Sequence, residues 1–221
     1  MESLFVLAKK KFQNIDMVVN NAGHSSSADW ERTVAVNCQG IVLGTLLGFK
    51  YLGADGGGKG GTIVNISSVS GLAPCHANPV FSASKHFTIG FSRSVGTEYF
   101  FKRTNVKVLT LCPGITHTEH HVRNVEGLPE FPDLGKELKK LLECNRSKQS
   151  PEDVATALMQ ILEDGENGSV WVAEAKEVYK CVLPDRCTFV PPKKDPCKKA
   201  EPPKQEPLKQ DPCKKAEAPK K

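Results

Sequence analysis

Short apolar runs alternate with longer segments of helical periodicity along most of this chain, and this alternation limits the folds open to it. Four runs have the length and apolar character of buried strands: residues 16–20, 62–67, 106–111 and 169–173. Apolar residues at helical spacing mark five further segments: residues 2–12, 30–52, 78–101, 134–143 and 151–163. Parallel strands need long crossover connections, which are usually helices. The sequence therefore predicts an α/β fold, with a mostly parallel sheet and helices on both of its faces.

The chain changes character at residue 184. From there to the end, 11 Lys and Arg stand against 6 Asp and Glu, whereas residues 1–183 carry 19 of each. Nine of the 15 prolines lie in this last segment, and the sequence DPCKKAE occurs at 195–201 and again at 211–217. Such a segment buries too little to offset the entropy of ordering it. We predict a domain over residues 1–183 and a disordered, basic, low-complexity tail over 184–221.

The sequence also indicates which partners this protein binds and where in the cell it is located. The net charge of +5 belongs to the tail, so the body gives no argument for binding nucleic acid. The tail either keeps the chain soluble or docks on an acidic polymer or surface. The longest apolar stretch, Ile41–Phe49, is too short to span a bilayer, so we expect no transmembrane segment. The start of the chain has no secretory pattern, and its eight cysteines are scattered singly, which predicts a cytoplasmic protein.

Four motifs stand beside the predicted strands at characteristic distances. Asn20-Asn21-Ala22-Gly23 follows the first strand, and Asn37 lies in the next helix. Ser68 ends the second strand, and Phe81-Ser-Ala-Ser-Lys85 begins 13 residues later. Pro113-Gly114-Ile115-Thr116-His117-Thr118 follows the third strand. In this combination, residues 1–183 resemble the short-chain dehydrogenase/reductase family, in particular its 15-hydroxyprostaglandin dehydrogenase and insect alcohol dehydrogenase-like branch.

The resemblance implies a partial Rossmann-like fold, NAD as cofactor, and oxidation of alcohols or hydroxy lipids as the activity. The family's catalytic Asn, Ser and Lys map to Asn37, Ser68 and Lys85, and Phe81 occupies the position of its catalytic Tyr. The cofactor-binding positions map to Asn21, Ala22, Gly23, Lys85, Gly114, Ile115 and Thr118. In the family, the helices at about residues 30–52 and 78–101 form the dimer interface, so we expect a homodimer.

Two departures from the family pattern bear on activity. In the family, a phenol whose pKa is lowered by a nearby ammonium removes the hydroxyl proton of the substrate, and the phenyl ring of Phe81 cannot do so. The family's Gly-rich phosphate-binding turn also belongs to a part of the fold that would precede residue 1 of this chain. We therefore expect a catalytically impaired protein with a binding or structural role, in which NAD binding is doubtful. The alternative is an active NAD-dependent dehydrogenase of this branch, of which the 221 residues are an incomplete sequence.

Two other patterns resemble known sites but differ from them. Residues 53–60 are as Gly-rich as a P-loop, yet Gly60 stands where a P-loop has Ser or Thr after its Lys, so we predict a surface turn. His117, Glu119, His120 and His121 have no zincin spacing, and we expect no metal site.

Overall fold

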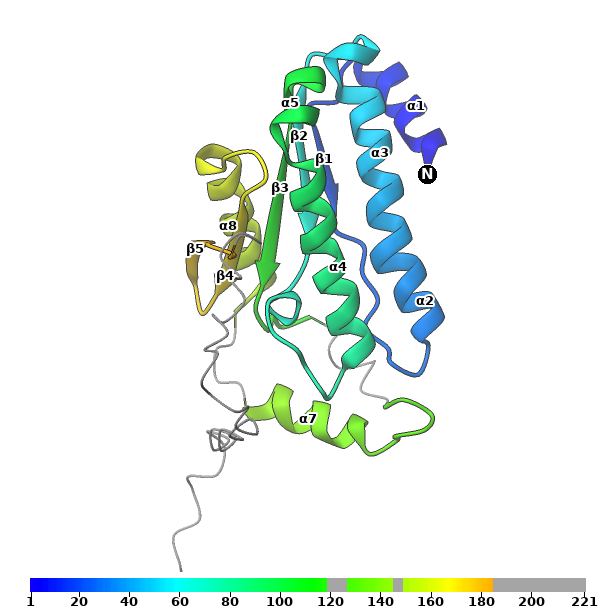
Figure 1. Cartoon of the computed structure of the whole chain (residues 1–221), viewed down its shortest axis with the longest axis vertical. Helices are drawn as coiled ribbons and strands as arrows, with labels where there is room; N and C mark the ends of the chain where they lie inside the picture. Colours follow the sequence, from blue (N-terminus) through cyan, green and yellow to red (C-terminus); the bar gives the residue numbers. More distant parts are fainter. Residues whose placement is uncertain (119–126, 145–148, 185–221) are drawn as a thin grey trace, which may run out of the picture. The chain divides into compact units, whose positions relative to one another are not determined.

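A computed structural model describes residues 1–118, 127–144 and 149–184, and it contains the predicted alternation of strands and helices (Figure 1). Of the two units into which the chain divides, Met1–Val182 and Leu183–Lys221, the first holds all the helices and strands that are described. The repeat of the predicted tail lies outside the described residues.

The sheet has five strands in the order β1-β2-β3-β4-β5. They are β1 (Met17–Asn20), β2 (Gly61–Ile66), β3 (Val106–Pro113), β4 (Val170–Glu174) and β5 (Glu177–Cys181). The first four are parallel, with Val64 opposite Val19 on one side and Leu109 on the other. This confirms the predicted α/β class. Among the described strands β1 pairs with β2 alone, and an apolar hollow of about 340 Å³ lies between β1, the first helix and the helix that follows β1.

Strand β5 was not predicted, and it runs antiparallel to β4. The two residues that join them, Ala175 and Lys176, have φ values of 54° and 68°. Positive φ at both central residues is typical of the tight hairpin turn whose twist matches that of the strands. Asn and Gly are the usual residues there. The sequence therefore carries no recognisable hairpin signal at this point.

One face of the sheet is covered by helices that follow β1 and β2. The predicted helix over 30–52 is one continuous stretch made of α2 (Trp30–Val34), a π-helical turn η1 (Ala35–Gln39) and α3 (Gly40–Leu52). By length and composition this stretch would be able to cross a membrane. In this fold α3 instead packs on β1 and β2, where Phe49 and Leu52 share a core with Ile63 and Val108.

Further helices complete the domain. On the opposite face, α8 (Pro151–Asp164) buries Ala157 and Ile161 against Leu109, Leu111 and Trp171. The first helix, α1 (Glu2–Phe12), packs against α3. Helix α7 (Leu134–Cys144) lies beyond the carboxyl ends of the strands (Figure 1).

The prediction of a single helix over 78–101 is wrong, because the structure has two helices in this region, α4 (Pro79–Val95) and α5 (Glu98–Thr104). The break falls at Gly96, where a side-chain Cβ would lie 2.6 Å from the Cα of Gly168. Asn167 Nδ2 also donates to the carbonyl of Gly96 at 2.9 Å. The loop before β4 thus occupies the space that a continuing helix would need. Asn167 of that loop also bonds to the carbonyl of Gly96, which would accept a backbone hydrogen bond if the helix continued.

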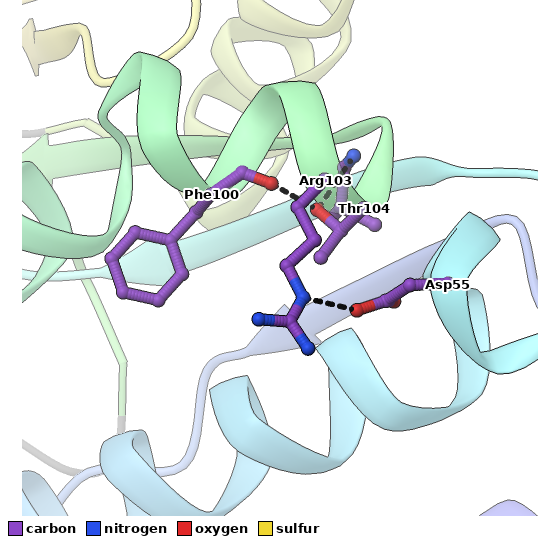
Figure 2. A network of polar contacts seen from close by, with 5 residues as sticks. Asp55, Phe100, Arg103 and Thr104 are labelled. Carbon is purple, nitrogen blue, oxygen red and sulfur yellow. Dashed lines mark hydrogen bonds and ion pairs between the residues drawn. The ribbon is translucent and has the colours of Figure 1, made fainter.

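Side chains fix the connection from α5 into β3 (Figure 2). Thr104 Oγ1 donates to the carbonyl of Phe100 at 2.8 Å and accepts from the N–H of Val106 at 3.2 Å. Arg103 Nε donates to Asp55 Oδ2 at 2.9 Å, which links α5 to the 3₁₀ turn η2 (Ala54–Gly56). That turn belongs to the Gly-rich segment 53–60, which is a surface turn between α3 and β2, as predicted.

Candidate active site

Asn37 lies in the π-helical turn η1, where the N–H of Gly40 donates to the carbonyl of Ala35, five residues earlier. Such turns are rare and frequently occur at functional sites. The buried Asn37 side chain accepts from the N–H of His24 and donates to its carbonyl, both at 2.8 Å. Its Nδ2 also donates to Ser84 Oγ at 2.9 Å. The side chain therefore holds the loop after β1 against α4, and its role in holding a relay water stays a prediction.

Lys85 is 5% exposed, on the inner face of α4. Its Nζ donates to the carbonyl of Ile66, at the end of β2, at 3.0 Å. It forms no ion pair with any residue in the described part of the chain. Burial away from water lowers the pKa of Lys85 to about 8, and weak effects of Cys112 and Cys38 oppose the shift. The amine therefore loses its proton at lower pH than an exposed lysine does, but it carries its charge below about pH 8.

Phe81 lies one helical turn before Lys85, and the Lys85 Nζ is 5.5 Å from the centroid of its ring. An ammonium at this distance from a ring is within the range of a cation–π contact. It is also close enough to lower the pKa of a phenol at position 81. The phenyl ring itself has no proton to give or accept.

A pocket of about 240 Å³ opens beside these residues at the carboxyl end of the sheet. It brings together four of the residues singled out from the sequence, Ser68, Phe81, Gly114 and Ile115. Ser68 Oγ accepts from the N–H of Ser70 at 3.2 Å, which caps a short 3₁₀ turn, η3 (Val69–Gly71). Asn37 and Lys85 are not among the residues that line this pocket.

The predicted cofactor residues divide between two places. Gly23 lies over Asn37 and Lys85, since a Cβ built on it would be 3.7 Å from both Asn37 Oδ1 and Lys85 Nζ. Asn21 and Ala22 line the other hollow, beside the open edge of β1. Thr118 is exposed and lines neither.

We tested this arrangement against NAD, the cofactor that the resemblance implies. None of the described helices that follow β1, β2 or β3 starts from a Gly-rich turn, which is the usual cradle for a pyrophosphate. The described residues therefore do not fit a complete dinucleotide.

A buried glutamine that the sequence did not reveal holds the loop after β3. Gln149 Nε2 donates to the Oγ1 of Thr116 at 3.1 Å and to the carbonyl of Ala173 at 2.9 Å. The N–H of His117 donates in turn to the carbonyl of Gln149 at 2.9 Å. The loop that carries Gly114 and Ile115 is thus fixed to β4.

Sequence reasoning also missed several residues that line the pocket. Ser25, Cys75 and Asn78 are polar, and α7 supplies Leu138, Leu141 and Leu142. The leucines have the i, i+3, i+4 spacing of one helix face, a signal that was readable. In the part of the chain that the structure describes, no group of three or more His, Cys, Asp or Glu side chains could hold a metal ion. Glu119, His120 and His121 lie outside that part, so the absence of a metal site stays a prediction.

Comparison with known proteins gives a consistent result. The family model described as "short chain dehydrogenase" matches residues 1–128. "Alcohol dehydrogenase 2" of Ceratitis capitata is 37% identical over 175 residues, which cover 79% of this chain and 66% of that protein. "15-hydroxyprostaglandin dehydrogenase [NAD(+)]" of Rattus norvegicus is 33% identical over 162 residues, which cover 72% and 60%.

Among solved structures, that of levodione reductase superposes with a TM-score of 0.62 over 79% of this chain and 70% of its own. At 23% identity, this likeness shows the fold alone. The chain spans 60–66% of the length of the two curated relatives named above.

Proposed function

This chain belongs to the short-chain dehydrogenase family, and from that premise we propose that it is a member impaired in catalysis, which acts by binding. Its relatives include NAD-dependent dehydrogenases. The observation that carries the proposal is Phe81, which lines the pocket one helical turn before a buried lysine.

The chemistry of alcohol oxidation explains why this residue matters. Hydride can leave a carbinol carbon only as the hydroxyl proton departs, so a base must stand at the oxygen. At position 81 the ring offers no such base, and among the described lining residues of the pocket there is no His, Asp, Glu, Lys or Tyr to replace it. Loss of a general base costs about 10²–10⁴-fold in rate.

The retained residues have structural roles that account for them without catalysis. Asn37 fixes the loop after β1 through three hydrogen bonds, and Ser68 caps a turn. Lys85 donates to the end of β2. These contacts support a pocket that persists after proton transfer has been lost.

The test is to incubate the purified full chain with NAD and a panel of primary and secondary alcohols. We expect no formation of NADH above the rate without protein, and calorimetry should detect no micromolar affinity for NAD or NADH. NADH formation by the wild-type chain would overturn the proposal and favour an active NAD-dependent dehydrogenase.

A variant tests the assignment of position 81 separately. In Phe81→Tyr, the ammonium of Lys85 should lower the pKa of the new phenol, visible as additional tyrosinate absorption at lower pH than that of the three tyrosines of the wild type. Phe131→Tyr, at an exposed position outside the pocket, is the control and should show tyrosinate absorption only at higher pH. Identical titrations of the two variants would contradict the assignment.

A further inference from the structure

Helix α1 has an apolar surface that the described part of the chain leaves exposed to water. Phe5 is the one buried residue of this helix, and its ring contacts that of Tyr51 on α3, with 5.4 Å between the two centroids. Leu4, Leu7 and Phe12 are each more than 60% exposed. Exposed apolar side chains that gather in one place are typical of a surface that binds a protein or a membrane.

The last turn of the same helix is strongly basic. Lys9, Lys10 and Lys11 follow one another there, and the last two are exposed. None of the three forms an ion pair with another described residue. The only acidic residue of α1, Glu2, already pairs with Lys50 of α3. The end of the helix therefore carries positive charge with which no described carboxylate pairs.

The apolar and the basic side chains lie next to one another on the helix. Lys10 and Lys11 follow Leu7 by three and four residues, and side chains at these spacings are neighbours on a helix surface. Leu4 precedes Leu7 by three residues and adjoins it for the same reason. Lys11 also reaches over the exposed ring of Phe12, with its Nζ 5.2 Å from the ring centroid. Leucine, phenylalanine and lysine side by side are typical of helices that lie in the surface of a membrane.

We propose that α1 docks this protein on the surface of a bilayer that contains anionic lipids. Leu4 and Leu7 enter the boundary between headgroups and acyl chains, and the lysines of the last turn contact the anionic headgroups. Binding of this kind grows with the apolar area that is buried and with the electrostatic attraction to the headgroups. Each lysine near such a surface strengthens binding about fivefold.

A second protein chain is the other candidate to cover this surface. Lysines are depleted in protein interfaces, because an ammonium buried against an apolar partner loses its hydration. Here Lys10 and Lys11 adjoin Leu7 and would be covered together with it. On a bilayer the same lysines stay hydrated among the headgroups while Leu7 is buried. The position of the charges therefore favours a lipid surface.

The test measures binding of the full chain to vesicles of phosphatidylcholine alone, and of two parts phosphatidylcholine to one part phosphatidylserine. Co-sedimentation should show binding at least about tenfold tighter to the second kind, and weaker at high salt. The double variant Lys10→Ser, Lys11→Ser should bind about 25-fold more weakly, about fivefold for each lysine removed. The matched control Lys136→Ser, Lys139→Ser removes the same charge from exposed positions of α7 and should leave binding unchanged.

The basic tail is a second source of attraction to such vesicles, so the test also needs a probe on α1 itself. Leu7→Trp places an indole in the proposed surface, and brominated phosphatidylcholine in the vesicles should quench its fluorescence. The emission of the wild-type chain, which has Trp30 and Trp171, is subtracted. Met159→Trp, at an exposed position of α8, is the control and should show no quenching beyond the wild type.

Three results would overturn the proposal: equal binding to both kinds of vesicle, equal effects of the two double variants, or no quenching of the indole at position 7. Binding without that quenching would assign the attraction to the tail. Self-association without vesicles that Leu7→Glu abolishes, measured by sedimentation velocity, would also overturn it, because α1 would then bind a second copy of the chain.

Discussion

At the scale of the residue, Lys85 makes stability depend on pH. In the unfolded chain a lysine has a pKa of about 10.4, whereas burial lowers the pKa of Lys85 to about 8 in the folded chain. Between these values the unfolded chain binds more protons, so the free energy of unfolding rises with pH. Below about pH 8 both states carry the charge, and the full penalty of burying it applies, about 3 kcal/mol as an order of magnitude.

Lys85→Met tests this dependence, because methionine has a long side chain without the charge. The free energy of unfolding of the wild type, relative to that of Lys85→Met, should rise by about 3 kcal/mol from about pH 7 to about pH 10.5. Urea denaturation at several pH values measures it. Lys107→Met is the control, since Lys107 also donates to a backbone carbonyl, that of Gly165, but is half-exposed. Parallel pH profiles for the wild type and Lys85→Met would show that Lys85 is not buried as described.

At the scale of the element, α8 begins with a complete capping box. Ser150 Oγ accepts from the N–H of Asp153 at 3.2 Å, and Asp153 Oδ2 accepts from the N–H of Ser150 at 2.8 Å. Pro151 takes the first helical position, where its missing N–H costs nothing. The helix is thereby started directly after Gln149, the residue that holds the loop following β3.

Ser150→Ala should lower the free energy of unfolding by about 1 kcal/mol, because the N–H of Asp153 loses its acceptor. Chemical denaturation monitored by circular dichroism measures the change. Thr156→Ala, an exposed substitution within the same helix, should alter stability by no more than a few tenths of a kcal/mol. Equal effects of the two variants would mean that the capping box contributes nothing.

An element could be predicted where the residues that determine it lie close together in the sequence, and not where it depends on residues far along the chain. Strands β1 to β4 and most helices follow from local periodicity, and the sequence showed them. The break at Gly96 depends on its contact with Gly168, far along the chain, so no local pattern marks it. The turn at Ala175 and Lys176 uses residues that seldom adopt positive φ, which left β5 unpredicted.

The same distinction applies to the site. The one-turn spacing of Phe81 and Lys85 could be read from the sequence, as could the positions of Ser68 and Gly114 after strands. The direction of a side chain depends on packing, so the sequence did not show that Ala22 faces a different hollow. Nor did it show that Ser25 lines the pocket.

At the scale of the whole molecule, we propose self-association through the helices that cover one face of the sheet. Helix α2 contacts α4, and the outer surfaces of α3 and α4 expose Leu43, Leu46 and Phe87, each by more than 40%. Exposed apolar groups on adjacent helices are typical of protein interfaces. The docking of the basic tail stays a prediction, because residues 185–221 lie outside the described part of the chain. The cytoplasmic location also stays a prediction, since no observation tests it.

Leu46→Glu should shift the chain from dimer to monomer, because it places a charge in the centre of the proposed interface. Sedimentation velocity over a range of protein concentrations measures this. Met159→Glu is the control, as this exposed residue lies on α8, on the opposite face of the sheet. A wild-type chain that is monomeric at all concentrations, or equal behaviour of both variants, would exclude this interface.

The outer edge of β1 has a consequence for handling the protein. The backbone amides and carbonyls on the side away from β2 lie next to an apolar hollow, and Met17, at the start of the strand, is 44% exposed without a charge. A strand rim of this kind is a template on which other extended chains polymerise. Pairing with another extended chain at this border would involve the four residues of β1.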